Sequence, residues 1–195
     1  MRLFVALDLD DDIRGRISRY LDDMRGFAPE ARWVRPEALH VTLKFIGEKA
    51  VDEAKKIKRS LGTIRAEAFD LNIGGYGFFP GARAPQVFWI GIEGGPQLAS
   101  LAATVDGNLA ALSIPKEEHA FNPHLTLARG SRGSERRNRG KIDGSPHRFH
   151  RLQEKLAALP APEFGTMTAR EFFLYLSEPL PGGSRYTKLA GFALH

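Results

Sequence analysis

The sequence predicts one compact domain in which helices and strands mix along the whole chain. Its 195 residues suit one substantial domain better than two independent ones. Hydrophobic residues make up 43% and charged residues 26%, close to the averages for soluble globular proteins. Segments with helical spacing alternate with short apolar segments bounded by Gly or Pro. We therefore expect residues 1–195 to fold as a single unit.

Three segments have the apolar spacing of amphipathic helices. The first runs from Asp10 to Gly26, begins with Asp caps and places an apolar residue at every third or fourth position. The second runs from Val51 to Ala66, with its lysines mostly on the polar face. The third runs from about Pro96 to Leu112, where Pro suits the first turn of a helix.

Six segments have the composition of strands, because most of their residues are β-branched or aromatic and Gly or Pro bounds them. In chain order they are Leu3–Leu7, His40–Ile46, Phe69–Ile73, Val87–Ile92, His124–Ala128 and Glu171–Leu176.

The composition argues against a membrane or secreted protein. No stretch approaches the ~20 apolar residues that span a bilayer, and there is no Cys for disulfides or thiolate metal sites. The N-terminal apolar run stops at Asp8, which is unlike a signal peptide and typical of a buried first strand. We expect a cytoplasmic protein.

The charge favours a polyanionic partner. The net charge is +5 and the pI is about 9.6, and clustered Lys and Arg attract phosphates without reading sequence. The segment 129–151 is the most basic part and is interspersed with Gly and Ser, so we expect a basic loop. Such a loop either contacts nucleic acid or is a solvated insertion with no role.

A short motif occurs twice. His40-Val41-Thr42-Leu43 is repeated as His124-Leu125-Thr126-Leu127. The composition predicts only about 0.2 chance occurrences of His followed two residues later by Thr. The duplication is therefore a candidate functional feature.

Strand geometry gives the motif a chemical face. Residues two apart on a strand point the same way, about 6–7 Å apart, so each motif presents an imidazole and a hydroxyl together. The alternating aliphatic residues, Val41 with Leu43 and Leu125 with Leu127, then face the core and anchor the strand. Two such strands can therefore line one cleft with two histidines, His40 and His124, and two threonines, Thr42 and Thr126.

Two histidines suit the cleavage of a phosphodiester. Near neutral pH one imidazole can be neutral and accept a proton from water, while the other is protonated and donates to the leaving oxygen. Thr42 and Thr126 can donate hydrogen bonds to the phosphate oxygens, where charge grows. The residues alone do not decide which histidine is the acid.

Two other interpretations compete with this one. Each His and Thr could simply occupy the polar face of a half-exposed strand, which the duplication disfavours. A metal site would need further ligands, and neither motif supplies a neighbouring Asp, Glu, Cys or second His. We expect no metal and no other cofactor.

The chain closely resembles the 2H phosphoesterases, and among them the RNA 2′,3′-cyclic phosphodiesterases, also called 2′-5′ RNA ligase-like proteins. The resemblance runs almost end to end. It is carried by MRLFVAL at the N-terminus, WVRPEALHVTLKFIGE from Trp33 to Glu48, QVFWIGI from Gln86 to Ile92, FNPHLTLAR from Phe121 to Arg129, and a C-terminal block that includes Tyr186.

The resemblance implies an α+β fold of two pseudo-symmetric lobes, each an antiparallel sheet backed by helices, around a central active-site groove. It implies metal-independent opening of RNA 2′,3′-cyclic phosphates to 2′-phosphates, in some members with reversible 2′-5′ ligation. By this resemblance His40 is the proton donor and His124 the proton acceptor. We expect a monomer that acts on RNA ends.

Three further residues are candidates for substrate binding. Arg129 resembles a family position near the phosphate, although it could be an ordinary exposed arginine at a strand end. Phe45 and Tyr186 could stack on a nucleobase, and core packing is the alternative for Phe45. The remaining histidines, His119, His147, His150 and His195, are expected at the surface.

Two other functions remain open. The chain could be a non-catalytic RNA-binding protein on the same scaffold, which intact histidines in both motifs disfavour. It could also act on 2′-5′ oligonucleotides or other cyclic phosphates, because substrate choice depends on loops that the sequence does not describe.

Overall fold

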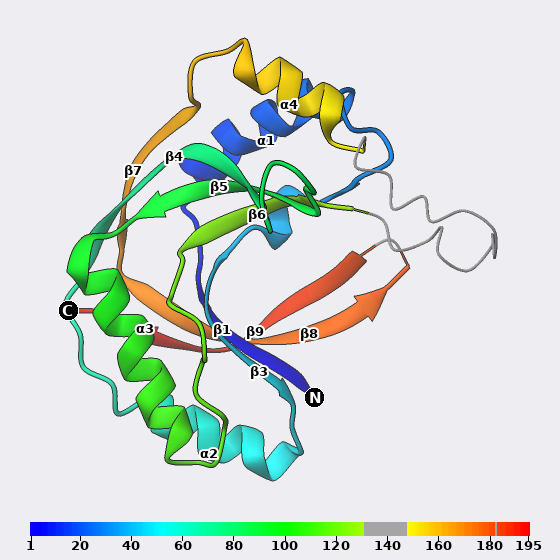
Figure 1. Cartoon of the computed structure of the whole chain (residues 1–195). Coiled ribbons are helices and arrows are strands. Elements are labelled where there is room, and N and C mark those ends of the chain that lie inside the picture. The colour runs from blue at the N-terminus through cyan, green and yellow to red at the C-terminus, as the bar shows by residue number, and fades with distance from the viewer. Residues whose placement is uncertain (131–147, 182) are drawn as a thin grey trace.

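The structure is a computed structural model of the chain, and it describes residues 1–130, 148–181 and 183–195 (Figure 1). It is an α+β fold with two antiparallel sheets. The expected fold class is confirmed. Most of the basic segment predicted at 129–151, including its arginines 132, 136, 137 and 139, lies outside the described residues.

The first sheet has the strand order β3-β1-β8-β9 and contains the first motif. The N-terminal strand β1 pairs antiparallel with β3 on one side and β8 on the other, and β8 and β9 form a hairpin. The strands are β1 (Arg2–Leu7), β3 (Val41–Glu48), β8 (Glu171–Leu180) and β9 (Gly183–Ala193).

The second sheet has the order β2-β6-β5-β4-β7 and contains the second motif. The motif strand β6 lies between β5 and the short edge strand β2. The strands are β2 (Arg32–Trp33), β4 (Phe69–Phe79), β5 (Val87–Glu93), β6 (His124–Arg129) and β7 (Glu163–Ala169).

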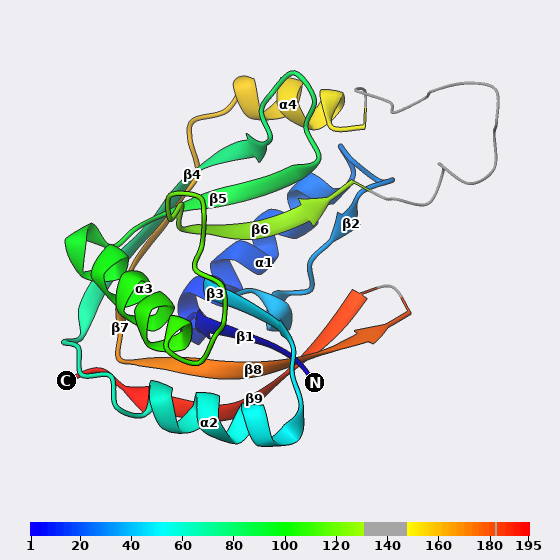
Figure 2. The ribbon, with the colours of Figure 1, turned by 60° about the horizontal axis from the view of Figure 1, so that its bottom comes forward.

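The helices pack on the two sheets in pairs (Figure 2). On the second sheet lie α1 (Asp11–Arg25), whose Arg16 donates to Phe164 O at 3.0 Å, and α4 (His150–Ala157), preceded by Phe149 against Phe78. With the first sheet lie α2 (Val51–Leu61) and α3 (Gly95–Ala110), joined by Asn108 and Ser60. A short 3-10 helix, η1 (Pro36–Ala38), precedes the first motif. No helix of the described part is long and apolar enough to cross a membrane.

One continuous apolar cluster joins both sheets and the helices. The predicted stripe of α1 is buried at Ile13, Ile17, Leu21 and Met24, and Asp10 caps the helix by accepting from the Ile13 N–H at 2.8 Å. Apolar burial of this kind supplies about 25 cal/mol per Å². The two motif strands are therefore mounted on a shared core.

Several predicted boundaries were wrong. The helix predicted to reach Ala66 ends at Leu61, because Gly62 caps it and the chain then turns inward to bury Ile64. The basic loop predicted to reach Arg151 gives way to α4 at His150, whose Leu152 and Leu156 are buried. The third helix begins at Gly95, as predicted to within one residue, and ends at Ala110, two residues before the predicted Leu112.

The strand predictions missed three strands and shortened others. One of the three is β2, which has only two residues, Arg32 and Trp33. β7 and β9 were not predicted, because both are edge strands that carry several Gly, Thr and charged residues. β4 extends to Phe79, beyond the predicted Ile73, and β8 extends to Leu180, beyond Leu176. β3 begins at Val41, so His40 lies just before its strand.

Candidate active site

A groove with a cavity volume of about 590 Å³ lies where the two sheets meet. Strands β1, β3, β8 and β9 of the first sheet and β2 and β6 of the second contribute to its lining. Figure 2 shows β3 and β6 at this junction, on facing parts of the two sheets. Both histidines and both threonines of the motifs line the groove.

His40 lies just before β3, against an aromatic cluster. Its ring is 4.7 Å from that of Phe4 and 5.1 Å from that of Tyr186, measured between centroids. Its Nδ1 is 2.8 Å from the carbonyl oxygen of Ala38, at the end of η1. The imidazole is therefore fixed on one side by packing and on the other by a hydrogen bond.

His124 lies at the start of β6 in a matching arrangement. Its Nδ1 is 2.8 Å from the carbonyl oxygen of Asn122, again two residues before the histidine. Its ring lies 5.0 Å from that of Phe79 and 6.2 Å from that of Trp89. The two lobes therefore hold their histidines in the same way.

These contacts determine the tautomer of each neutral ring. A carbonyl oxygen can only accept a hydrogen bond, so Nδ1 carries the proton and donates it. The other ring nitrogen, Nε2, is then unprotonated in the neutral imidazole. Nε2 is thus the atom of each ring that can exchange a proton in the groove.

Each motif contains a β-bulge at the same position. In the pairing of β3 with β1, Thr42 faces Ala6 and Lys44 faces Val5, which leaves Leu43 as an extra residue. In the pairing of β6 with β5, Thr126 faces Trp89 and Ala128 faces Phe88, which leaves Leu127 extra. A bulge interrupts the alternation of side chains along its strand.

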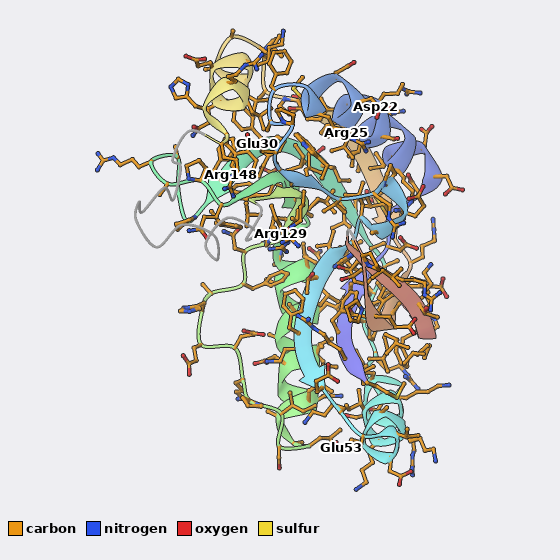
Figure 3. All side chains as sticks on the ribbon, turned by 90° about the vertical axis from the view of Figure 1, so that its right-hand side faces the viewer. Asp22, Arg25, Glu30, Glu53, Arg129 and Arg148 are labelled. Atoms are coloured by element: carbon orange, nitrogen blue, oxygen red, sulfur yellow. The ribbon has the colours of Figure 1, made fainter. Side chains whose placement is uncertain are left out.

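The bulges bring the fifth residue after each histidine to the groove. Phe45 and Arg129 both line it, whereas the preceding residues, Lys44 and Ala128, are buried. Phe45 is 60% exposed, so the core-packing alternative for it was wrong. In Figure 3, Arg129 lies midway between the part of the molecule that carries α4 and the part that carries α2.

Burial lowers the pKa of both histidines. For His40 the loss of water outweighs the opposing effects of the Ala38 carbonyl and Asp8, and the pKa falls to about 4. For His124 burial also lowers the pKa against the Asn122 carbonyl, with a further contribution from the charge of Arg129. Without a ligand both imidazoles are therefore neutral at pH 7.

Binding of an anion in this groove is expected to strengthen as the pH falls. An anion favours the imidazolium form, so it raises the pKa of His40 from about 4 and its binding takes up a proton. Sulfate keeps its charge over this range, and its affinity should rise about tenfold or more from pH 8 to pH 5. Isothermal titration calorimetry measures this dependence.

His40→Asn should flatten most of the pH dependence of sulfate binding. His119→Asn is the control, because His119 is exposed and does not line the groove. A dependence of equal slope in His40→Asn would contradict the role of this imidazole.

The groove gathers every residue predicted for the site: the two histidines, Thr42, Thr126, Arg129, Phe45 and Tyr186. Arg129 Nη2 lies 3.5 Å from the Thr126 hydroxyl. Of the four histidines expected at the surface, His119, His150 and His195 are exposed, and His147 lies outside the described residues. Within the described ranges, no three His, Asp or Glu side chains gather as they would around a metal ion.

Sequence reasoning missed three arginines of the groove. Arg2, Arg32 and Arg35 line it from β1, β2 and the turn before η1. Each is exposed, and none forms an ion pair with a described residue. They lie at or beside the segments that carry the family resemblance, but a single arginine in a strand or turn has no pattern that marks it as a ligand.

A model of the LigT-like phosphoesterase family matches the chain twice, over residues 7–89 and 90–186. Each match contains one histidine motif. The double match therefore agrees with the equivalent bulges and hydrogen bonds of the two motifs.

Several relatives are similar over nearly their full lengths. An RNA 2′,3′-cyclic phosphodiesterase of Methanothermobacter thermautotrophicus is 31% identical, covering 100% of this chain and 99% of the relative. The protein of the same name from Escherichia coli is 30% identical over 99% of this chain and 96% of its own length. A crystal structure of Escherichia coli LigT complexed with 3′-AMP has a TM-score of 0.76 at 30% identity, covering 99% of this chain and 97% of that one.

Proposed function

The chain belongs to the LigT-like phosphoesterase family, and on that premise we propose that it is an RNA 2′,3′-cyclic phosphodiesterase. It opens the terminal cyclic phosphate to a 2′-phosphate, with His40 and His124 as acid and base and without a metal ion. One observation carries this proposal: two equivalent motifs bring two imidazoles and two hydroxyls into one groove.

The reaction needs one proton to be removed and one to be supplied. A water oxygen attacks phosphorus while Nε2 of His124 takes one of its protons. His40 takes up a proton on Nε2 when the anionic phosphate binds, because the anion favours the imidazolium form. The bond from phosphorus to the 3′ oxygen breaks, and Nε2–H of His40 protonates that oxygen. Each such proton transfer contributes about 10²–10⁴-fold to the rate.

The surroundings of the two histidines support these unequal roles. Phe45 offers an exposed aromatic face on the strand that begins after His40, and aromatic side chains stack on unpaired bases. Tyr186 lies on the same side, against the His40 ring. A base stacked there places its ribose, and hence the leaving 3′ oxygen, beside His40. Water then attacks from the side of His124.

The cationic side of the groove suits the phosphate. Arg129 occupies the position that Phe45 has in the other motif. Its guanidinium and the hydroxyls of Thr42 and Thr126 can bind the non-bridging oxygens, where negative charge increases in the transition state. Burial lowers the pKa of His124 and the charge of Arg129 lowers it further, which favours the neutral form that a general base requires.

The same groove can support 2′-5′ ligation. If the 5′-hydroxyl of a second RNA takes the place of water, His124 removes its proton and His40 protonates the 3′ oxygen as before. The product is then a 2′-5′ linkage, and the reverse reaction uses the two histidines in exchanged roles. The balance of the two reactions depends on the concentration of RNA 5′ ends.

The test of this function is a turnover assay with product identification. An RNA oligomer ending in a 2′,3′-cyclic phosphate should be converted to the 2′-phosphate with EDTA present. A 3′-phosphate product would contradict the leaving group, and loss of turnover in EDTA would contradict metal independence. Binding of RNA without turnover would identify the chain as a non-catalytic RNA-binding protein.

Arginine variants distinguish RNA from a mononucleotide as substrate. Arg32→Gln combined with Arg35→Gln should raise KM for an oligomer but not for adenosine 2′,3′-cyclic phosphate, which has no upstream phosphates. Losing two phosphate contacts should make the slope of log(1/KM) against log salt concentration shallower by about 1.4. Arg19→Gln on α1 is the control, since Arg19 is exposed and outside the groove. Equal effects on both substrates would point to a mononucleotide or another cyclic phosphate.

A further inference from the structure

Lys44 is the only charged side chain that is fully buried among the described residues, at 3% exposure. The bulge at Leu43 turns it away from the groove and toward α3, although it follows Thr42 by two residues. Its ammonium contacts Asp106 Oδ1 at 2.7 Å, Pro115 O at 2.6 Å and Glu117 Oε1 at 3.4 Å. These three acceptors match the three donors of an ammonium group.

The contacts of Lys44 hold the segment that leads into the second motif. In the described structure no backbone–backbone hydrogen bond involves residues 115–123. Lys44 binds this segment at Pro115 and Glu117, and Asp106 also accepts from the Glu117 N–H at 3.3 Å. Near its end the segment contains Asn122, whose carbonyl oxygen accepts from His124 Nδ1. Figure 2 shows it running from α3 past β3 to β6.

Arg14 makes corresponding contacts before the first motif. From α1 its guanidinium donates to the carbonyl oxygens of Pro36 and Leu39, the latter at 3.3 Å. These residues flank Ala38, whose carbonyl oxygen accepts from His40 Nδ1. Arg14 is paired with Asp8 and its side chain is 17% exposed.

We propose that Lys44 and Arg14 are positioning residues, each of which orients one catalytic imidazole by holding the backbone that supplies its carbonyl acceptor. Lys44 acts on His124 across the boundary between the two sheets, and Arg14 acts on His40. Neither Lys44 nor Arg14 lines the groove. Each acts on its imidazole through a backbone carbonyl.

The physical basis is the directionality of the hydrogen bonds from a buried cation. A cation that binds backbone carbonyls and an ion-paired carboxylate favours one arrangement of the chain over others, even where its net stabilisation is small. A displacement of about 1 Å in a catalytic group can cost 10²-fold in rate. The segment before His124 has no regular structure, and the one before His40 has only the short 3-10 helix η1, so such a displacement is possible in both.

The test is a crossed experiment on the full chain. Lys44→Met and Arg14→Met remove the two cations while keeping much of the aliphatic volume. Two-bond 1H–15N NMR reports which ring nitrogen of each histidine carries the proton, and it needs no substrate. Kinetics with a cyclic-phosphate RNA oligomer form a second arm, and only that arm rests on the proposed function.

Lys44→Met should weaken the Nδ1–H preference of His124 and leave His40 unchanged, and Arg14→Met should do the reverse. In each variant kcat should fall about 10–100-fold, while KM changes less than about threefold. Lys55→Met and Arg19→Met are the matched controls, since both residues are exposed and neither lines the groove. If neither variant changes the NMR signals of its own histidine, the positioning roles are refuted. This outcome does not depend on whether the proposed substrate is correct.

Two results would contradict the proposal. One is a folded Lys44→Met protein with wild-type kcat and His124 signals. The other is an equal change in the signals of both imidazoles in either variant, which indicates that the substitution disturbs the fold as a whole. If Lys44→Met does not fold, Asp106→Asn is the second variant, because it weakens the same contacts from a side chain that is 20% exposed. It should shift the His124 signals in the same direction by less, and unchanged signals would refute the role of Lys44.

Discussion

Replacing His40 or His124 with alanine should slow hydrolysis of an RNA 2′,3′-cyclic phosphate by about 10²–10⁴-fold. Each variant removes one of the two proton transfers, and no other described imidazole lines the groove. Single-turnover assays with the oligomer measure the loss. The double variant should be only slightly slower than the worse single variant, because groups that act as a unit are not additive.

A substrate with sulfur at the bridging 3′ position separates the roles of the two histidines. A thiol has a pKa near 8.5, far below that of a ribose hydroxyl, so its thiolate leaves without a proton. The sulfur substrate should restore most of the rate lost in His40→Ala and little of that lost in His124→Ala. His119→Ala is the control with an exposed histidine. If the sulfur substrate restored the rate of His124→Ala instead, His124 would be the acid and His40 the base.

Gly77→Ala should destabilise the fold by about 1–3 kcal/mol. Gly77 in β4 faces Trp89 in β5, and an added Cβ would come 2.1 Å from a carbon of the Trp89 ring. That ring lies 5.1 Å from the Phe79 ring and next to His124, so it cannot move without disturbing the second motif. Urea unfolding with an unchanged m-value measures the change in stability.

Gly15→Ala is the matched control for Gly77→Ala. It lies inside α1, where an added Cβ meets nothing within 4 Å, so alanine should stabilise the helix by about 0.5–1 kcal/mol. Combining Gly77→Ala with Trp89→Leu should recover part of the stability lost in the single variant, because the leucine removes the ring that clashes. A Gly77→Ala protein as stable as the wild type would show that the indole relocates freely.

The sequence predicted the elements whose signals are local. The stripe of α1 is buried at each predicted position, and Val41, Leu43, Leu125 and Leu127 face the core as expected. The secondary-structure prediction failed for elements that form only because of contacts with neighbouring segments. β7 and β9 have weak strand composition and form because β4 and β8 offer free edges. α4 was hidden at the end of the basic segment, where only Leu152 and Leu156 mark its apolar face.

By itself the sequence identified the two histidines and two threonines as candidate site residues, because a repeated motif with period-two spacing is a local signal. Only the tertiary structure decided which other residues line the groove.

Strict alternation along the strand would place Lys44 on the same face as His40 and Phe45 on the core face, whereas the bulge reverses both. A bulge depends on pairing with β1, and the shared groove, the low pKa of His40 and the contacts of Lys44 and Arg14 depend on packing between segments distant in sequence. Such interactions leave no periodic trace in the chain that a single sequence could reveal.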